Sequence, residues 1–541
     1  MRPSAILKPF VYAALAVPLA AAATAAPQFN QDNIRATIKT LSSDPFGGRA
    51  PGSAGEKLTM DYISGKFKEY GVAPADNGSY LQEVPLKQIT ADPATVLSFS
   101  GGAAPITLAY GSEMVISTGR PVPEVTLKDA PLVFAGYGVV APEYHWNDYA
   151  GLDVKGKVVV VLVNDPGHAD PARFDGKAMT YYGRWTYKYE EAARQGAAGV
   201  LIVHELEPAG YPWEVVQGSW TGPLEELPPG DTYLPAIQGW ITHDSAEKLF
   251  TASGLDFAAL KQAAAKPGFR AVPMKLSVDV TLKNTVHDIV SHNVVGLLKG
   301  ASRPDEVLIY SAHWDHLGEH SVNGKTEIFH GAIDNGSGIS GLLELARVFA
   351  AGRRPARSVL FIATTCEEQN LLGAKYYAAH PFFPLRDTVG DINMDVLDTY
   401  GRTRDVTVRG GRFMSGMDDA LVAAAKSLGV SVSPDAEPEK GYYFRADHFE
   451  FAKAGVPALS IALGNDYVGR AAGWGATQHR DYVAHRYHKP ADVYDPAWDL
   501  SGMVEQLGLL YRTGYGLADS DSWPAWKNAG PFAAVRKAEG R

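Results

Sequence analysis

The second half of the chain alternates short apolar runs with amphipathic segments, and this alternation restricts the fold more than any other feature. Runs that are typical of short buried strands occur at residues 307–312, 359–364, 392–394 and 458–462. Between them, apolar residues recur with helical spacing at 339–349 and 417–428. The alternation predicts an α/β fold with a mixed, mostly parallel central sheet flanked by helices. In such folds, functional sites form at the carboxyl ends of the strands.

Ionisable residues stand at or just beyond the ends of these runs. They are His313, Asp315, Asp334, Glu367, Glu368, Asp395 and His488. Taken singly, each has an ordinary explanation. A lone histidine is commonly a buried side chain with satisfied hydrogen bonds, and Asp334, in a Gly-rich turn before a helix, can be a helix N-cap.

Taken together, the same residues indicate a metal site. Adjacent carboxylates such as Glu367 and Glu368 repel each other at a buried strand end, so they need nearby cations or a proton. Imidazole and carboxylate ligands without cysteine fit zinc in an open catalytic site. Two zinc ions that share a carboxylate would leave one Glu free to accept a proton from water. This pattern favours a metallohydrolase.

Length and charge limit the number of domains and the kind of partner. The chain has 541 residues, which is enough for two or more packed cores. Its net charge of -10 argues against nucleic acid as the main partner. Apolar runs at 158–163 and 199–203, with a helix at 189–195 between them, predict a compact β-rich module inserted before the alternating region.

The first 26 residues resemble a signal peptide. Arg2 and Lys8 precede an apolar run at 10–22, and Ala23-Thr24-Ala25 offers small residues for cleavage near Ala25. We therefore expect a periplasmic or secreted protein, the alternative being an N-terminal anchor that is retained. No later run reaches 18 apolar residues, so no stable membrane insertion is expected after cleavage.

The single cysteine, Cys366, is expected to be a small buried apolar residue rather than a catalytic thiolate.

The order and spacing of the ionisable motifs resemble a known family, the two-zinc aminopeptidases that also include glutamate carboxypeptidases and transferrin receptors. The resemblance extends to the Gly-Gly-Arg motif at 47–49 and to residues 444–449 and 454–458, while 149–163 and 189–203 resemble a protease-associated domain. Two small departures are Cys366, where small residues are common, and Ala446, where the family often has Ser.

The resemblance implies a domain layout and a role for each site residue. The expected layout is a signal peptide (1–26), a peptidase domain in two parts (27–130 and 281–520), a protease-associated insertion (131–280) and a C-terminal tail (521–541). His313 and Asp395 would hold one zinc ion, Glu368 and His488 the other, and Asp334 would bridge the two. Glu367 would be the general base and then the general acid, with Asp315 supporting His313.

The activity implied is hydrolysis of the N-terminal peptide bond of peptides by a dizinc-bound water. Alternatives are a dipeptidase or carboxypeptidase of the glutamate carboxypeptidase type, a glutaminyl cyclase with one zinc, and a receptor-like binding protein without catalysis. Tyr442, Tyr443 and His448 are candidate donors to the oxyanion. Arg445 either faces the groove and binds a substrate carboxylate or pairs with a neighbouring Asp.

Overall fold

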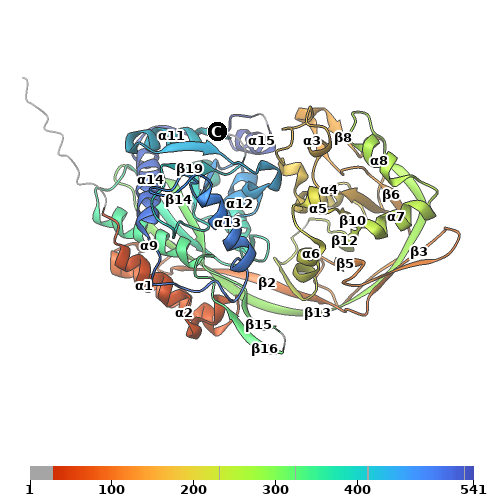
Figure 1. Ribbon diagram of the computed structural model, residues 1–541, viewed down its shortest axis with the longest axis horizontal. Helices are drawn as coiled ribbons and strands as arrows, with labels where there is room; N and C mark the ends of the chain where they lie inside the picture. Colours follow the sequence, from red (N-terminus) through yellow and green to blue (C-terminus); the bar gives the residue numbers. More distant parts are fainter. Residues whose placement is uncertain (1–27, 231, 323, 411–413, 529) are drawn as a thin grey trace, which may run out of the picture.

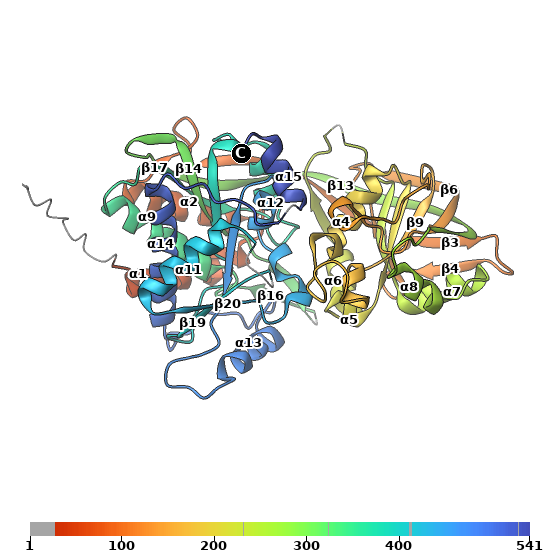
Figure 2. The same cartoon turned by 90° about the horizontal axis from the view of Figure 1, so that it is seen from above.

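The computed structural model describes residues 28–541 except 231, 323, 411–413 and 529. Its two lobes lie side by side, and each has its own hydrophobic core (Figures 1 and 2). The predicted signal peptide lies outside the described residues, so export stays a prediction. Within the described part of the chain, no helix is both long and apolar enough to span a bilayer.

The first lobe is built on a mixed sheet. Its strand order is β2 (Leu81–Ala91), β13 (Val272–Leu298), β17 (Arg357–Thr364), β14 (Arg303–His313), β18 (Thr388–Asn393) and β21 (Ala458–Ala462). The four strands from β17 to β21 are parallel, and β13 and β2 join them in antiparallel pairings. Beyond β21 the sheet continues with β19 (Asp405–Val408) and β20 (Ser431–Pro434). The predicted fold class is confirmed.

Helices cover both faces of this sheet. The alternating residues Leu308 and Tyr310 of β14 pack into the main core, together with α1 (Gln31–Leu41), α2 (Ala54–Tyr70), α9 (Gly336–Ala351), α11 (Gly416–Leu428) and α14 (Ser501–Asp519). Val307 and Ile309 of the same strand point to the other face, toward α10 (Leu372–Ala379) and α12 (His448–Lys453). Since both faces are covered, β17 and β18 are buried along their whole length.

The second lobe has a sheet of its own. Its order is β4 (Ile106–Ala109), β3 (Val96–Ser100), the first half of β13, β6 (Glu124–Phe134), β9 (Val158–Leu162), β10 (Gly199–His204), β12 (Ile237–Thr242) and β5 (Met114–Ser117). Leu97, Phe99 and Leu108 are buried in this core. The second lobe therefore begins near residue 91, earlier than the boundary at 131 expected from the sequence.

One strand belongs to both lobes. β13 has 27 residues, which corresponds to roughly 90 Å of extended chain. Its residues 272–283 pair with β3 and β6 in the second lobe, and its residues 284–298 pair with β2 and β17 in the first. Figure 1 shows β13 and β2 running together along one side of the molecule.

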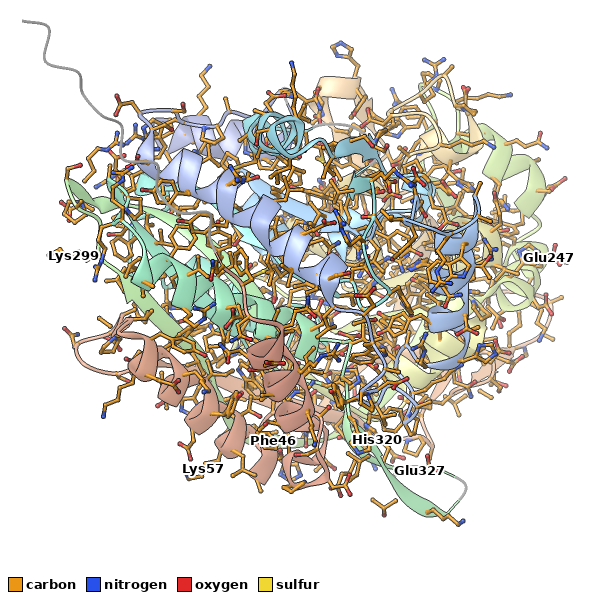
Figure 3. The ribbon with its side chains drawn as sticks, turned by 60° about the vertical axis from the view of Figure 1, so that its left-hand side comes forward. Phe46, Lys57, Glu247, Lys299, His320 and Glu327 are labelled. Carbon is orange, nitrogen blue, oxygen red and sulfur yellow. The ribbon has the colours of Figure 1, made fainter. Side chains whose placement is uncertain are left out.

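Two peripheral elements complete the first lobe. The strands β15 (Gly318–Val322) and β16 (Lys325–Phe329) form a hairpin that projects from the body, with His320 opposite Glu327 (Figure 3). The predicted tail contains the helix α15 (Pro531–Ala538), in which Phe532 is buried and Arg536 donates hydrogen bonds to the carbonyl oxygens of Leu385 and Thr388. Residues 531–538 are therefore part of the packed fold.

Arg49 connects the end of α1 with the segments that follow β14 and β16. Its guanidinium is fully buried and donates hydrogen bonds of 2.6–2.8 Å to four backbone carbonyl oxygens, those of Leu41, Trp314, His330 and Gly331. Burial lowers the pKa of Arg49 to about 10, so the side chain is still charged at neutral pH.

We expect Arg49→Met to destabilise the fold by roughly 3–5 kcal/mol, because it leaves several buried carbonyl groups without a donor. Urea unfolding followed by tryptophan fluorescence measures this loss. The control is Arg404→Met, which removes an exposed ion pair with Asp466 and should change stability by less than about 1 kcal/mol. Equal midpoints for the two variants would show that the Arg49 hydrogen bonds contribute little.

Candidate metal centre

The ionisable residues converge at one edge of the first lobe's sheet. His313 is the last residue of β14, Glu367 and Glu368 follow β17, and Asp395 follows β18. These three strands are parallel, so their carboxyl ends meet at the same edge. Asp334 precedes α9, and His488 lies in the loop after α13 (Trp474–His485).

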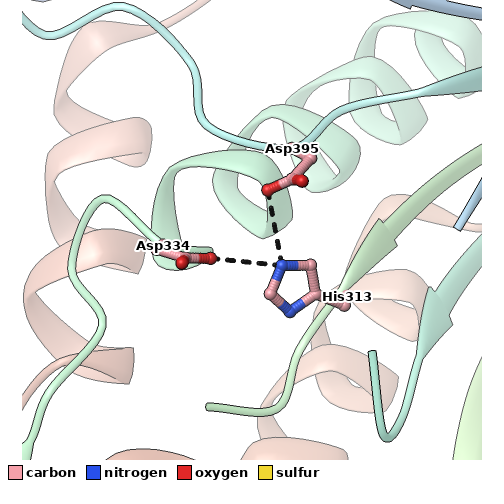
Figure 4. A group of neighbouring side chains, drawn as sticks. All are labelled: His313, Asp334 and Asp395. Carbon is pink, nitrogen blue, oxygen red and sulfur yellow. Dashed lines mark ion pairs between the residues drawn. The ribbon is translucent and has the colours of Figure 1, made fainter. Parts of the chain in front are cut away.

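The first group of side chains centres on His313, which is fully buried. Its Nε2 atom lies 3.2 Å from Oδ1 of Asp334 and 3.5 Å from Oδ1 of Asp395 (Figure 4). The other ring nitrogen, Nδ1, lies 3.1 Å from the carbonyl oxygen of Asp315, a distance at which it donates a hydrogen bond. That bond leaves the lone pair of Nε2 directed at two carboxylates.

The second group shares Asp334 with the first. Nε2 of His488 lies 3.2 Å from Oδ2 of Asp334 and 3.1 Å from Oε2 of Glu368. The other oxygen of Glu368 lies 2.7 Å from Nδ1 of His316. One carboxylate, Asp334, thus faces a histidine with each of its oxygens.

The charges of the cluster call for a cation. Burial alone would lower the pKa of His313, but Glu367, Asp334 and Asp395 raise it well above its usual value. Burial would likewise raise the pKa of Glu368, yet His488 and His316 lower it to about 2. The carboxylates are therefore stabilised by positive charge at these histidines. Either protons or metal ions can supply that charge.

The spacing of the donor atoms fits zinc. Zinc binds nitrogen and oxygen at about 2.0–2.1 Å in tetrahedral sites, so two ligand atoms of one ion lie roughly 3.3 Å apart. The four histidine-to-carboxylate distances of the two groups are 3.1–3.5 Å. In addition, Nε2 of His313 is buried without a hydrogen-bond partner. Each group can accommodate one ion with Asp334 shared between them.

Glu367 stands beside the first group. Its Oε2 atom lies 4.0 Å from Nε2 of His313, farther than the oxygens of Asp334 and Asp395. Burial raises the pKa of Glu367 well above its usual value, and the charges of Asp395 and Glu368 add to this effect. Glu367 is therefore a carboxyl group that can hold a proton next to the cluster.

Asp315 is placed differently from the sequence-based expectation. Its carboxylate is 3.8 Å from Nδ1 of His313, too far for a hydrogen bond, and the backbone carbonyl of Asp315 accepts from that ring instead. The carboxylate accepts the backbone N–H groups of Glu367 at 3.1 Å and of Glu368 at 3.3 Å. Asp315 thus orients the two glutamates, while Asp492 orients Asp334 by accepting its backbone N–H at 3.0 Å.

The four candidates for substrate contacts separate into two pairs. Tyr443 and His448 are buried and pack against each other with ring centroids 4.6 Å apart. Burial and then the charge of Arg409 lower the pKa of His448 to about 3, so its ring is neutral. Tyr442 and Arg445 are partly exposed, with the Arg445 guanidinium 5.2 Å from the Tyr442 ring centre.

Two further residues lie in this region. His316, to which the sequence assigned no role, contacts Glu368, and Tyr487 stacks on His488 with ring centroids 3.9 Å apart. The histidine pair at 313 and 316 is a signal that could have identified His316.

Comparisons with known proteins agree with this arrangement. The sequence model described as "Peptidase family M28" matches residues 293–510. A probable zinc metalloprotease of Pyricularia oryzae is 31% identical over 165 residues, 30% of each chain. Aminopeptidase NAALADL1 of Mus musculus is 32% identical over 139 residues, 24% of this chain and 17% of that protein. This chain therefore spans less than a third of the length of either relative.

A solved structure, an aminopeptidase from Aneurinibacillus sp. strain AM-1, aligns over 92% of this chain and 95% of its own, with 22% identity and a TM-score of 0.49. The segment of residues 293–510 that matches peptidase family M28 contains all seven ionisable residues from His313 to His488.

Proposed function

We propose that this protein is a zinc-dependent exopeptidase that hydrolyses the N-terminal peptide bond of peptides. The observation that carries the proposal is the pair of donor groups joined by Asp334, whose carboxylate faces His313 and His488 at 3.2 Å each. Relatives named as aminopeptidases and zinc metalloproteases support it. The second lobe would be a protease-associated domain, and the predicted leader would direct the enzyme out of the cytoplasm.

The ligand assignment follows the two groups. His313 and Asp395 would hold one ion, Glu368 and His488 the other, and Asp334 both, with His316 available to the second group through its contact with Glu368. Two zinc ions at this position would supply Lewis acidity, which lowers the pKa of water and polarises the scissile carbonyl.

The protein's own groups would handle the proton. Glu367 lies farther from His313 than Asp334 and Asp395 do, so its carboxylate would be free to act as the base. It would accept a proton from water and return it to the leaving amine. Asp315 would hold Glu367 and Glu368 in place through their backbone N–H groups. His313, Asp315 and Asp334 beside it are buried, which would limit the access of bulk water to this proton transfer.

The test is a panel of free and N-acetylated alanyl and leucyl substrates, with zinc quantified on the same sample. We expect hydrolysis of the free amines, about two zinc ions per chain, and loss of activity with a chelator that added zinc reverses. Preference for N-acetylated substrates with a free carboxyl terminus would favour a carboxypeptidase. One zinc per chain with cyclisation of N-terminal glutamine would favour a glutaminyl cyclase, and zinc binding without turnover a receptor-like protein.

A further inference from the structure

The two lobes are joined at two separate places. On one side of the molecule, β2 and β13 run together from lobe to lobe (Figure 1). On the opposite side, the C-terminal helix α15 lies beside α12 of the first lobe, next to the second lobe (Figures 1 and 2). The first connection is made by backbone hydrogen bonds, so it is the second one that depends on individual side chains.

Aromatic rings fill this second junction. Tyr181 of the second lobe begins the short helical turn Tyr181–Gly183, and its ring centroid lies 5.4 Å from that of Phe449 in α12 and 5.7 Å from that of Phe532 in α15. Phe449 and Phe532 are buried, with centroids 6.1 Å apart, and Trp526 packs on Phe532 at 5.2 Å. Aromatic pairs at such separations attract each other beyond the burial of their area. A ring of the second lobe is therefore held between rings of α12 and α15.

Polar contacts between the lobes surround these rings. The Tyr181 hydroxyl donates a hydrogen bond to Glu190 of the second lobe, and Glu190 pairs with Lys453 of α12 at 3.2 Å. Burial would raise the pKa of Glu190, but Lys453 and Tyr181 lower it, so the pair is charged at neutral pH. Nearby, the Met179 N–H donates to the carbonyl oxygen of Pro438 at 3.0 Å. The junction thus combines apolar packing with an ion pair and a backbone hydrogen bond.

The other end of α15 is fixed to the first lobe. Arg536 is buried and donates to the carbonyl oxygens of Leu385 and Thr388, at 2.7 and 2.8 Å. The Arg541 guanidinium lies 3.7 Å from the ring centre of Trp523. Because these contacts hold α15 on the first lobe, Phe532 has a fixed position from which it contacts Tyr181.

The junction also reaches the turn that carries Glu367. Leu371 is buried in the same apolar cluster as Phe449 and Phe532, and its backbone N–H donates to the carbonyl oxygen of Glu367 at 3.0 Å. The φ angle of Leu371 is +62°, a left-handed conformation that residues with a side chain seldom adopt. The packing of Leu371 against the junction holds this conformation, so a displacement at the junction would be transmitted to Glu367.

We propose that α15 holds the second lobe in a closed position against the first, and that the lobes separate about β13 when the contact between Tyr181 and Phe532 is lost. Along β13, residues up to 283 pair with β6 and residues from 284 pair with β2, and this change of partner is the point at which the strand can bend. Domains of one chain move relative to each other unless a sufficient apolar contact holds them together. The inference concerns the position of the lobes and goes beyond the proposed function.

The experiment measures the distance between spin labels on the two lobes of the full-length protein. Lys177→Cys in the second lobe and Lys426→Cys in α11 provide exposed attachment sites, and the native Cys366 is buried. We expect one narrow distance distribution without further changes. Phe532→Ala should increase the population of a second distance roughly 10- to 100-fold, since it removes a buried aromatic ring from the junction.

Two further variants make the test specific. Lys453→Met removes the ion pair with Glu190 but leaves α15 unchanged, so it tests the junction even if Phe532→Ala folds poorly, and it should also populate the second distance. Val535→Ala, at an exposed position of the same helix, is the matched control and should keep the single distance. An unchanged distribution in the double variant of Phe532→Ala and Lys453→Met overturns the proposal. An equal change in Val535→Ala also overturns it, because the contact with Tyr181 would then have no special role.

A distance measurement separates this inference from the proposed function. If the zinc-loaded protein hydrolyses no free-amine substrate, the exopeptidase assignment fails while the distances still report on the junction. If the exopeptidase assignment holds, kcat of Phe532→Ala on a leucyl substrate should fall together with the appearance of the second distance. A fall in kcat with an unchanged distance would show that Phe532 acts only through the Leu371 turn, and the proposed separation of the lobes would be wrong.

Discussion

Glu367→Gln is expected to reduce kcat by roughly 10²- to 10⁴-fold, the contribution of a positioned general acid-base group, while about two zinc ions remain bound. The substitution keeps the size and the backbone hydrogen bond to Asp315 but removes the ability to accept a proton. Turnover of a leucyl substrate and zinc content, measured on the same preparation, check both parts of this expectation.

The zinc content distinguishes two roles for Glu367. His313, Glu367 and Glu368 also form a group whose atoms are close enough to hold an ion. If Glu367→Gln loses one zinc ion, Glu367 is a ligand and the assignment of the base is wrong. Glu69→Gln, on an exposed face of α2, is the control and should change neither quantity.

Asp334→Asn is expected to remove most of both zinc ions and to reduce activity at least 10³-fold. Its two oxygens face His313 and His488 at 3.2 Å each, so the neutral amide weakens both groups at once. Zinc analysis after dialysis measures the loss directly. Zinc should also raise the melting temperature of the wild-type protein more than that of the variant, because a ligand bound only by the folded state stabilises it.

A matched variant makes this test specific. Asp395 faces His313 but has no described contact with His488. Asp395→Asn should therefore release about one zinc ion where Asp334→Asn releases both. Equal losses for the two variants would contradict a carboxylate shared between the groups.

Much of the site was predictable because its residues adjoin strands that the sequence marks clearly. Runs such as Val359–Thr364 are apolar on both faces, and the polar residues that follow them can only lie at the sheet's edge. The distances between those residues could not be predicted, because they depend on the register between β14, β17 and β18. The carboxylate of Asp315 was assigned to His313 for this reason, whereas it contacts the backbone after β17.

The second lobe was harder to delimit. Its first strands, β3 to β5, are four or five residues long, and their buried residues join a core whose other members extend as far as Leu282. Local sequence patterns report which residues are buried, but they do not report which distant segments share a core.

The long strand β13 has a consequence for how this protein can be altered. Because its residues on both sides of position 284 are held in ladders of different lobes, the lobes are joined by continuous backbone hydrogen bonding and not by a flexible linker. Excision of the second lobe would remove β11 (Pro223–Glu226), which pairs with residues 87–90 of β2, and would cut β13, a strand of the first lobe's sheet. A shortened protein would therefore need a new edge strand, with charged residues or proline to discourage aggregation.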